Sequence, residues 1–228
     1  MAVRGGIACI RMFLMVFNSL LCLCGLMLLI FGFWLCIDSW QMEDSELEPS
    51  STSFSFGLAV FFLMAVGAFV MFLGAVGCFG AGLEALNVLE MYFALLLSAL
   101  VVELIVAVVS IVEQDWVVAT LQDLHAHVYI KFLKTEKTSL GLTLMVLHHA
   151  LDCCGSRGLV DQLVAHTCPA RSGLAVFTLQ SCSSTITALF EQQGHVVYAA
   201  WIGLIMVTIL AMVFSVVLWA RIRRSGKR

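Results

Sequence analysis

The sequence predicts an all-α membrane protein: a bundle of four transmembrane helices with a large, mainly helical extracellular loop that is cross-linked by disulfides. Hydrophobic residues make up 61% of the 228 residues and charged residues only 12%, whereas soluble domains carry about 25% charged residues. Four apolar runs are each long enough to cross the roughly 30 Å hydrocarbon core as a helix. Between the last two runs lies a long segment that contains four cysteines.

The four predicted transmembrane helices cover residues 12–36, 56–79, 88–112 and 196–220. The first run is too long for the apolar core of a signal peptide, which has about 7 to 15 residues, so we expect it to remain as a span. Charged residues occur only in the third run, as Glu90 near its start and Glu103 deep inside it.

The distribution of Lys and Arg predicts the orientation. Arg4 and Arg11 precede the first span and five basic residues follow the last one, whereas the segment 37–55 holds five acidic residues and no basic one. Cytoplasmic segments are enriched in Lys and Arg. We therefore expect cytoplasmic segments at 1–11, 80–87 and 221–228, and extracellular loops at 37–55 and 113–195.

The predicted large loop contains Cys153, Cys154, Cys168 and Cys182. In an oxidising compartment such cysteines form disulfides, and four cysteines allow three pairings. The pairing that joins the adjacent Cys153 and Cys154 is strained, which leaves two alternatives open. Either one closes loops of roughly 14 to 29 residues and stabilises the loop by about 3 kcal/mol in the chain-entropy model.

Apolar residues recur every three or four positions in the first part of this loop, which predicts two amphipathic helices. These positions are Val117, Leu121, Leu124, Val128 and Phe132, then Leu140, Leu144, Leu147 and Leu151. After Cys154 the pattern weakens, so residues Ser156 to Ser181 are expected to form a variable insert. Because binding residues often lie on loops that a rigid frame holds, this insert is the predicted partner-binding region.

Small and polar residues mark the predicted helix contacts in the membrane. Gly25 and Gly32 follow Asn18 at intervals of seven, and Gly67 and Gly74 repeat the interval in the second span, which predicts a helix-packing seam. A carboxylate in the bilayer costs about 2.5 to 3.5 kcal/mol. Glu103 and Asn18 are therefore expected to face the bundle interior, either as interhelical contacts or as the lining of a lipid-binding cavity.

Motifs for catalysis are not found. The sequence has no Ser/His/Asp arrangement, no phosphate-binding glycine loop and no basic patch suited to nucleic acid, so we expect neither an enzyme nor a nucleic-acid-binding protein. Residues one or two positions apart do not lie on the same face of a helix. This applies to His125 and His127 and to His148 and His149. We therefore expect no metal site, and histidines that are solvated or packed.

Several motifs resemble those of the tetraspanin family. "LDCCGS" at 151–156 and "CP" at 168–169 are similar to the large loop of that family, "GCFGAGLE" at 77–84 to the inner end of its second span, and "ACIR" and "FN" to its first span. With four loop cysteines, the chain resembles the short-loop subgroup of leukocyte and gamete tetraspanins. The resemblance implies the disulfide pairs Cys153–Cys182 and Cys154–Cys168.

The resemblance also implies a function. Tetraspanins are membrane scaffolds, so it implies lateral association with integrins, immunoglobulin-superfamily proteins, other tetraspanins or further copies of the chain, in adhesion, migration or cell fusion. It implies a location in the plasma membrane, endosomes or extracellular vesicles, and cholesterol or another lipid as ligand. An oligomeric channel or transport subunit is the alternative, disfavoured because such pathways usually contain more intramembrane charge.

The chain differs from the family pattern at the positions where lipidation is expected. Phe79 and the pair Trp219–Ala220 stand where relatives carry cysteines. Juxtamembrane cysteines are the usual S-acylation sites. Cys9 and Cys78 therefore remain as the expected palmitoylation sites.

Overall fold

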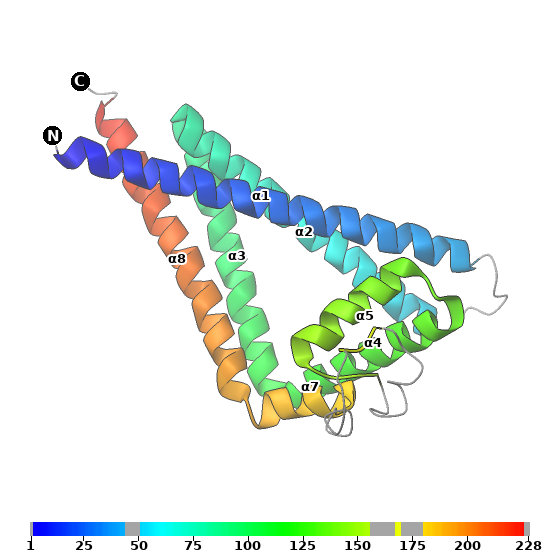
Figure 1. Ribbon diagram of the computed structural model, residues 1–228. Helices are drawn as coiled ribbons and strands as arrows, with labels where there is room; N and C mark the ends of the chain where they lie inside the picture. Colours follow the sequence, from blue (N-terminus) through cyan, green and yellow to red (C-terminus); the bar gives the residue numbers. More distant parts are fainter. Residues whose placement is uncertain (1, 44–50, 156–166, 170–179, 226–228) are drawn as a thin grey trace. The chain divides into compact units, whose positions relative to one another are not determined.

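The computed structural model describes residues 2–43, 51–155, 167–169 and 180–225. These residues are helical apart from short connections and one isolated parallel β-bridge between Cys153 and Gln180, which confirms the predicted all-α class. The helices are α1 (Ala2–Glu43), α2 (Ser51–Leu83), α3 (Leu86–Val112), α4 (Gln114–Thr135), α5 (Thr138–Leu151), α7 (Cys182–Glu191) and α8 (Gly194–Ser225) (Figure 1).

Four of these helices are long and apolar enough to cross a membrane. Within the described residues, the apolar stretches are Ala8–Asp38, Phe56–Leu83, Leu86–Val112 and Gly194–Arg224. Their exposed side chains are largely apolar, as in Met12, Phe62 and Ile202, which are each more than half exposed. A helix satisfies its backbone polar groups internally, so such surfaces suit hydrocarbon as a solvent.

The helices extend beyond the predicted spans where no residue breaks them. Helix α1 continues to Glu43, and α2 and α3 leave only Glu84 and Ala85 between them instead of the expected segment 80–87. The sequence from Gly80 to Leu83 lacks a proline, so the helix can continue. The turn is made at Glu84, whose φ of 53° lies in the left-handed region.

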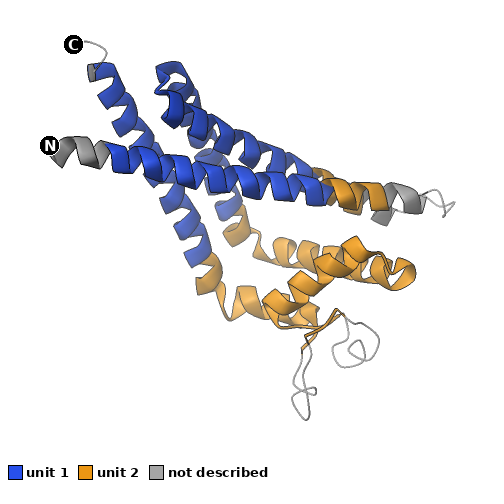
Figure 2. Ribbon diagram, turned by 45° about the horizontal axis from the view of Figure 1, so that its top comes forward, with its two compact units in different colours: residues 1–32, 62–108, 199–228 blue, residues 33–61, 109–198 orange. Residues whose placement is uncertain are grey.

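The chain forms two compact units, which Figure 2 colours separately. The first comprises residues 1–32, 62–108 and 199–228, and its core contains residues from all four long helices. The buried members are Leu14, Leu73, Val76, Ala81, Leu89, Tyr92, Leu96, Ala211 and Leu218. Because the surrounding helix faces are equally apolar, this core is set by close packing rather than by a contrast between apolar and polar surfaces.

The second unit comprises residues 33–61 and 109–198, and α4, α5 and α7 pack on one another within it. The predicted apolar stripes supply much of the contact: Val128, Leu140 and Leu144 are buried. Leu121 is an exception, since 40% of it is exposed. Helices α4 and α5 are separated by a left-handed residue at Glu136, whose backbone N–H bonds to the Phe132 carbonyl.

Candidate functional site: the disulfide-linked loop

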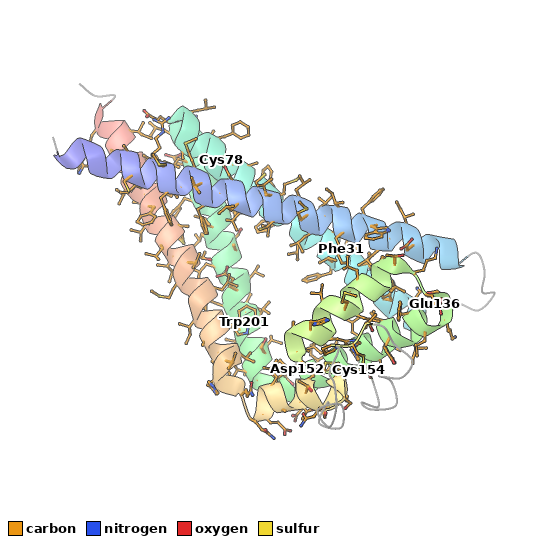
Figure 3. All side chains as sticks on the ribbon, in the orientation of Figure 1. Phe31, Cys78, Glu136, Asp152, Cys154 and Trp201 are labelled. Atoms are coloured by element: carbon orange, nitrogen blue, oxygen red, sulfur yellow. A yellow bond between two sulfur atoms is a disulfide. The ribbon has the colours of Figure 1, made fainter. Side chains whose placement is uncertain are left out.

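Two disulfides close the loop between α5 and α7. Cys153 is bonded to Cys182, with a Cα–Cα distance of 4.9 Å, and Cys154 to Cys168, with 5.3 Å. These are the pairs that the family resemblance implies. The two adjacent cysteines thus face different partners: Cys153 joins the end of α5 to the start of α7, and Cys154 holds the middle of the loop. Figure 3 labels Cys154 and Asp152 where α5 ends.

Backbone hydrogen bonds fix the two ends of the insert next to each other. The Cys154 N–H donates to the Gln180 carbonyl at 3.1 Å, and the Cys182 N–H donates to the Gly155 carbonyl at 3.0 Å. Gly155 has a φ of 54°, a conformation that glycine adopts without steric cost. The residues 156–166 and 170–179 of the predicted partner-binding region lie outside the described residues, but their anchoring points are defined.

Helix α7 is held by α4. The Gln122 side chain of α4 donates to the Ser183 carbonyl at 2.9 Å and lies 2.8 Å from Thr187 Oγ1. Ser181 caps α7, because its hydroxyl accepts a hydrogen bond from the Ser184 N–H. A capping side chain of this kind stabilises a helix by about 1 kcal/mol. The base of the loop is therefore a fixed frame.

The core of this frame contains a histidine pair that joins α4 to α5. His125 Nε2 lies 3.3 Å from His148 Nε2, and 5% of His125 and none of His148 is exposed. His149, the next residue, is exposed. The pair forms between two helices, so the spacing of one or two residues between histidines within each helix gives no sequence signal for it.

The same pair is the place where a metal ion would be sought among the described residues. His125, His148 and Cys182 have ligand atoms within 4.8 Å of one another. The Cys182 sulfur, however, is already bonded to Cys153, and a metal ligand must be a thiolate. The cluster thus offers two imidazoles, fewer than the three or four protein ligands of zinc sites.

Two contacts connect the helical frame to the long helices within the second unit. The Ser139 hydroxyl at the start of α5 donates to the Asp38 carboxylate of α1. The Lys131 ammonium of α4 lies 4.4 Å from the ring centroid of Phe56 in α2, within the range of a cation–π interaction. Neither contact has a sequence signal, because the residues are far apart in the chain.

The predicted packing glycines lie where α1 and α2 approach each other. A Cβ atom on Gly25 would lie 2.3 Å from the Met71 nitrogen, and one on Gly74 would lie 2.6 Å from the Asn18 carbonyl oxygen. A Cβ atom on Gly67 would lie 2.8 Å from the Leu29 nitrogen, and one on Gly32 would lie 2.6 Å from Cγ of the Met64 side chain. Three of the four glycines therefore allow backbone-to-backbone contact.

The side chain of Glu103 in α3 bonds to α8. Thr208 of α8 donates a hydrogen bond of 2.8 Å to Glu103 Oε1. Glu103 Oε2 is buried and has no hydrogen-bond partner among the described residues. Glu103 thus bonds to α8 through Thr208, while its role as an interhelical contact or as a lipid contact stays a prediction.

A polar cluster lies where α8 meets the start of α3. Trp219 Nε1–H donates to Glu90 Oε1 at 3.0 Å, and the Arg223 guanidinium lies 4.9 Å from the Trp219 ring centroid. Trp219 thus holds two helices together.

The expected acylation sites differ in their surroundings. Cys9 is exposed, whereas Cys78 is half-buried. The Cys78 sulfur lies 3.3 Å from Ser19 Oγ and 3.5 Å from the Met15 carbonyl oxygen. Cys78 therefore faces α1.

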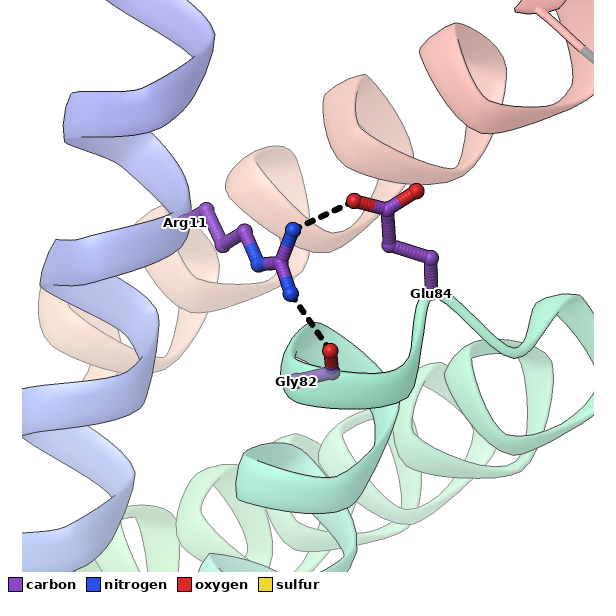
Figure 4. Close-up of polar contacts among 3 residues, drawn as sticks. All are labelled: Arg11, Gly82 and Glu84. Atoms are coloured by element: carbon purple, nitrogen blue, oxygen red, sulfur yellow. Dashed lines mark hydrogen bonds and ion pairs between the residues drawn. The ribbon is translucent and has the colours of Figure 1, made fainter.

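An ion pair fixes the connection between α2 and α3. The Arg11 guanidinium of α1 donates to the Glu84 carboxylate and to the Gly82 carbonyl oxygen (Figure 4). Both side chains are at least a third exposed, so the pair contributes at most about 1 kcal/mol. An open cleft of about 630 Å³ lies beside it, lined by Glu84, Ala85, Leu86, Asn87, Val88, Ile222 and Arg223.

The chain is similar to known proteins along nearly its whole length. The model of the Tetraspanin family matches residues 10–221. CD9 antigen from Chlorocebus aethiops is 36% identical over 225 residues, which cover 99% of this chain and 98% of that protein. Tetraspanin-2 from Mus musculus is 30% identical, with 97% and 96% covered, and CD81 antigen from Homo sapiens is 27% identical, with 99% covered in both.

Proposed function

The chain belongs to the tetraspanin family, and from this premise we propose that it is a non-enzymatic scaffold that organises other membrane proteins laterally. Four apolar helices provide the surface for contacts within the membrane. The disulfide-linked frame provides a second surface outside it. Its partners are integrins and immunoglobulin-superfamily proteins, other tetraspanins or further copies of the chain, in adhesion, migration or cell fusion.

The orientation follows from the charge distribution. Both termini lie in the cytoplasm, since the basic residues flank the first and last spans and the segment 37–55 is acidic. The large loop is then extracellular, where its two disulfides persist. The plasma membrane is the main location, with endosomes and extracellular vesicles as further sites.

The proposal rests mainly on one feature: hydrogen bonds and a disulfide hold the base of the insert Ser156 to Ser181 in place. Gly155 and Cys182 are hydrogen-bonded to each other, and Cys168 is tied to Cys154. An insert that is anchored at both ends and in its middle loses less conformational entropy on binding than a free loop does. It is therefore suited to recognise a partner protein.

Purification of the full-length chain in a mild detergent tests this function. A specific membrane protein should copurify with the native chain. It should be lost when residues 157–166 are replaced by a Gly/Ser sequence of equal length, which keeps all four cysteines. Replacement of His149 by Gln on the exposed side of α5 is the matched control, and binding should persist. Ion flux after reconstitution, without a copurifying partner, would instead favour a channel subunit.

A further inference from the structure

Helix α5 is apolar on its exposed side as well as on its packed side. Its 14 residues contain no Lys, Arg, Asp or Glu, and they are too few to cross a bilayer, which takes about 20. The helix packs on α4 and α7, where Leu144 is fully buried. On the other side Leu142, Met145 and Val146 are 43%, 42% and 62% exposed. Exposed apolar patches on a helix mark a surface that contacts a protein or a membrane.

The three side chains form one continuous surface. Residues three and four positions apart are neighbours on a helix, so Leu142 lies beside both Met145 and Val146. We call these three residues the apolar face of α5. Helix α4, in contrast, exposes the charged Asp123 near its middle.

Two contacts place one end of the frame at the level where the spans leave the membrane. The first apolar stretch ends at Asp38, and the second begins at Phe56. Ser139, in the first turn of α5, donates a hydrogen bond to Asp38, and Lys131 of α4 lies 4.4 Å from the ring centroid of Phe56. Each span crosses the bilayer once, so these two span ends lie at the same membrane interface.

The other end of α4 lies at this interface too. Only Glu113 separates the start of α4 from the end of the third span. Trp116, one turn further, is 62% exposed, and tryptophan is enriched at membrane interfaces. With both of its ends held there, α4 runs along the membrane rather than away from it, and α5 packs on α4. Val146 lies only about 10 Å along α5 from Ser139, at 1.5 Å per residue.

Lipid matches the apolar face of α5 better than a protein partner does. A stable protein interface buries about 800 Å² on each side, which is more than three half-exposed side chains on one helix provide. A helix that lies in a membrane interface buries its apolar side chains about 5 to 10 Å into the boundary between headgroups and acyl chains. No charge on α5 opposes such burial.

We propose that the apolar face of α5 is a lipid-binding surface that rests in the headgroup–acyl boundary of the leaflet on the loop side, the outer leaflet in the proposed orientation. The frame is then held at the membrane by lipid as well as by its contacts to Asp38 and Phe56. This inference rests on the four membrane-spanning helices. It is independent of the protein that the insert binds.

Hydroxyl-radical labelling of the full-length native chain in phosphatidylcholine nanodiscs tests whether water reaches this face. Radicals generated in the water oxidise accessible methionines. Met145 should be as protected as Met27, which is 67% exposed on the protein but lies within the first apolar stretch. The variant Asp123→Met places a methionine on the exposed side of α4 as the control, and this residue should be oxidised severalfold faster than Met145.

Photo-labelling in the same nanodiscs identifies what covers the face. A phosphatidylcholine that carries a diazirine near the glycerol end of its acyl chain should label residues 142–146 of the native chain and leave the α4 segment around Asp123 unlabelled. Leu142→Asp combined with Val146→Asp should lower the α5 label severalfold, because carboxylates stay in water. Both disulfides should still form in this variant, which shows that the loop folds, and labelling of the spans should be unchanged.

The two measurements on the native chain decide the proposal together. Oxidation of Met145 as fast as that of the added methionine in Asp123→Met would overturn it. Protection of Met145 without a lipid label on α5 would overturn it too, because a protein partner or a second copy of the chain would then cover the face.

Discussion

Tyr92 in α3 donates a hydrogen bond of 3.0 Å to Asn18 Oδ1 in α1, and Asn18 is fully buried. The Asn18 amide also donates to the Leu14 carbonyl at 2.8 Å. A Cβ atom on Gly77 of α2 would lie 2.3 Å from the same Oδ1. One amide thus contacts three helices, and it does so only because residue 77 has no side chain. In hydrocarbon no water replaces a lost partner, so the hydrogen bond specifies how these helices meet.

Tyr92→Phe should therefore destabilise the bundle. The substitution keeps the ring but leaves Asn18 Oδ1 without its phenol donor, at an expected cost of about 0.5 to 2 kcal/mol. Tyr198→Phe is the matched control, because 40% of Tyr198 is exposed. Thermal unfolding in detergent measures both. An equal shift for the two variants would show that the Asn18 contact contributes nothing specific.

The packing of α1 against α2 should not tolerate a methyl group at Gly25. In Gly25→Ala the new Cβ would lie 2.3 Å from the Met71 nitrogen and 2.8 Å from the Gly67 oxygen. These are backbone atoms, so the helices must separate, and overpacking costs about 1 to 3 kcal/mol or more. Gly203→Ala adds the same methyl group in α8, where no heavy atom lies within 4 Å of it, and should leave the unfolding temperature unchanged or higher. If both variants unfold alike, the close contact is not formed.

The spans, the disulfide loop and the glycine seam are predictable from sequence because each rests on a local or periodic signal. Hydropathy marks a span wherever it lies in the fold, and "CCG" encodes both its cysteine pair and the left-handed glycine at 155. The contacts between side chains far apart in the sequence are different. His125–His148 and Glu90–Trp219 depend on which faces of two helices meet, and the spacing within either helix carries no information on that.

The turn between α2 and α3 shows the same limit at short range. The end of the apolar run predicts the connecting segment 80–87, whereas the helices leave only Glu84 and Ala85 between them. The Arg11 guanidinium reaches across from α1 to the Glu84 carboxylate and the Gly82 carbonyl. A tertiary contact thus supplies a hydrogen-bond donor to a carbonyl group at the end of α2. Hydropathy does not detect such a contact.

Glu103 and Thr208 should be energetically coupled. A double-mutant cycle with Glu103→Leu and Thr208→Val isolates their 2.8 Å hydrogen bond, and interhelical hydrogen bonds in membranes average about 0.6 kcal/mol and reach about 1.7 kcal/mol. Either single variant can be neutral, since Glu103→Leu also removes a polar group from lipid. Ser215→Ala, seven residues further along α8, serves as the uncoupled control for Glu103. A coupling of zero for the Thr208 cycle would exclude the contact.

The two disulfides should have separable effects. In the chain-entropy model the Cys153–Cys182 bond, which spans 29 residues, stabilises by about 3.6 kcal/mol, and the Cys154–Cys168 bond, which spans 14, by about 3 kcal/mol. Replacing Cys154 and Cys168 by Ser should free the insert but leave α7 on α4. Replacing Cys153 and Cys182 should release α7 from α5. Hydrogen exchange of α7 distinguishes the two, and equal exchange in both variants would contradict this division.

S-acylation should depend mainly on Cys9. In the proposed orientation, acylation needs a thiol near the cytoplasmic face, and its nucleophile is the thiolate. Cys9 is exposed and lies at the start of the apolar stretch that begins at Ala8. Cys78 lies about 7.5 Å before the end of α2 at 1.5 Å per residue, and its sulfur contacts Ser19 and Met15, which makes it less accessible.

Cys9→Ser should accordingly remove most of the acylation, and Cys9→Ser combined with Cys78→Ser should remove all of it. Cys24→Ser is the control: Cys24 is exposed, but it lies about 24 Å along α1 from Ala8, within the span. An acyl-exchange mass shift counts the modified cysteines in each variant. Surface delivery should stay near normal because four spans already anchor the chain, while partner recovery in mild detergent should weaken. A mass shift that persists in the double variant would show that a third cysteine is modified and that the assigned depths are wrong.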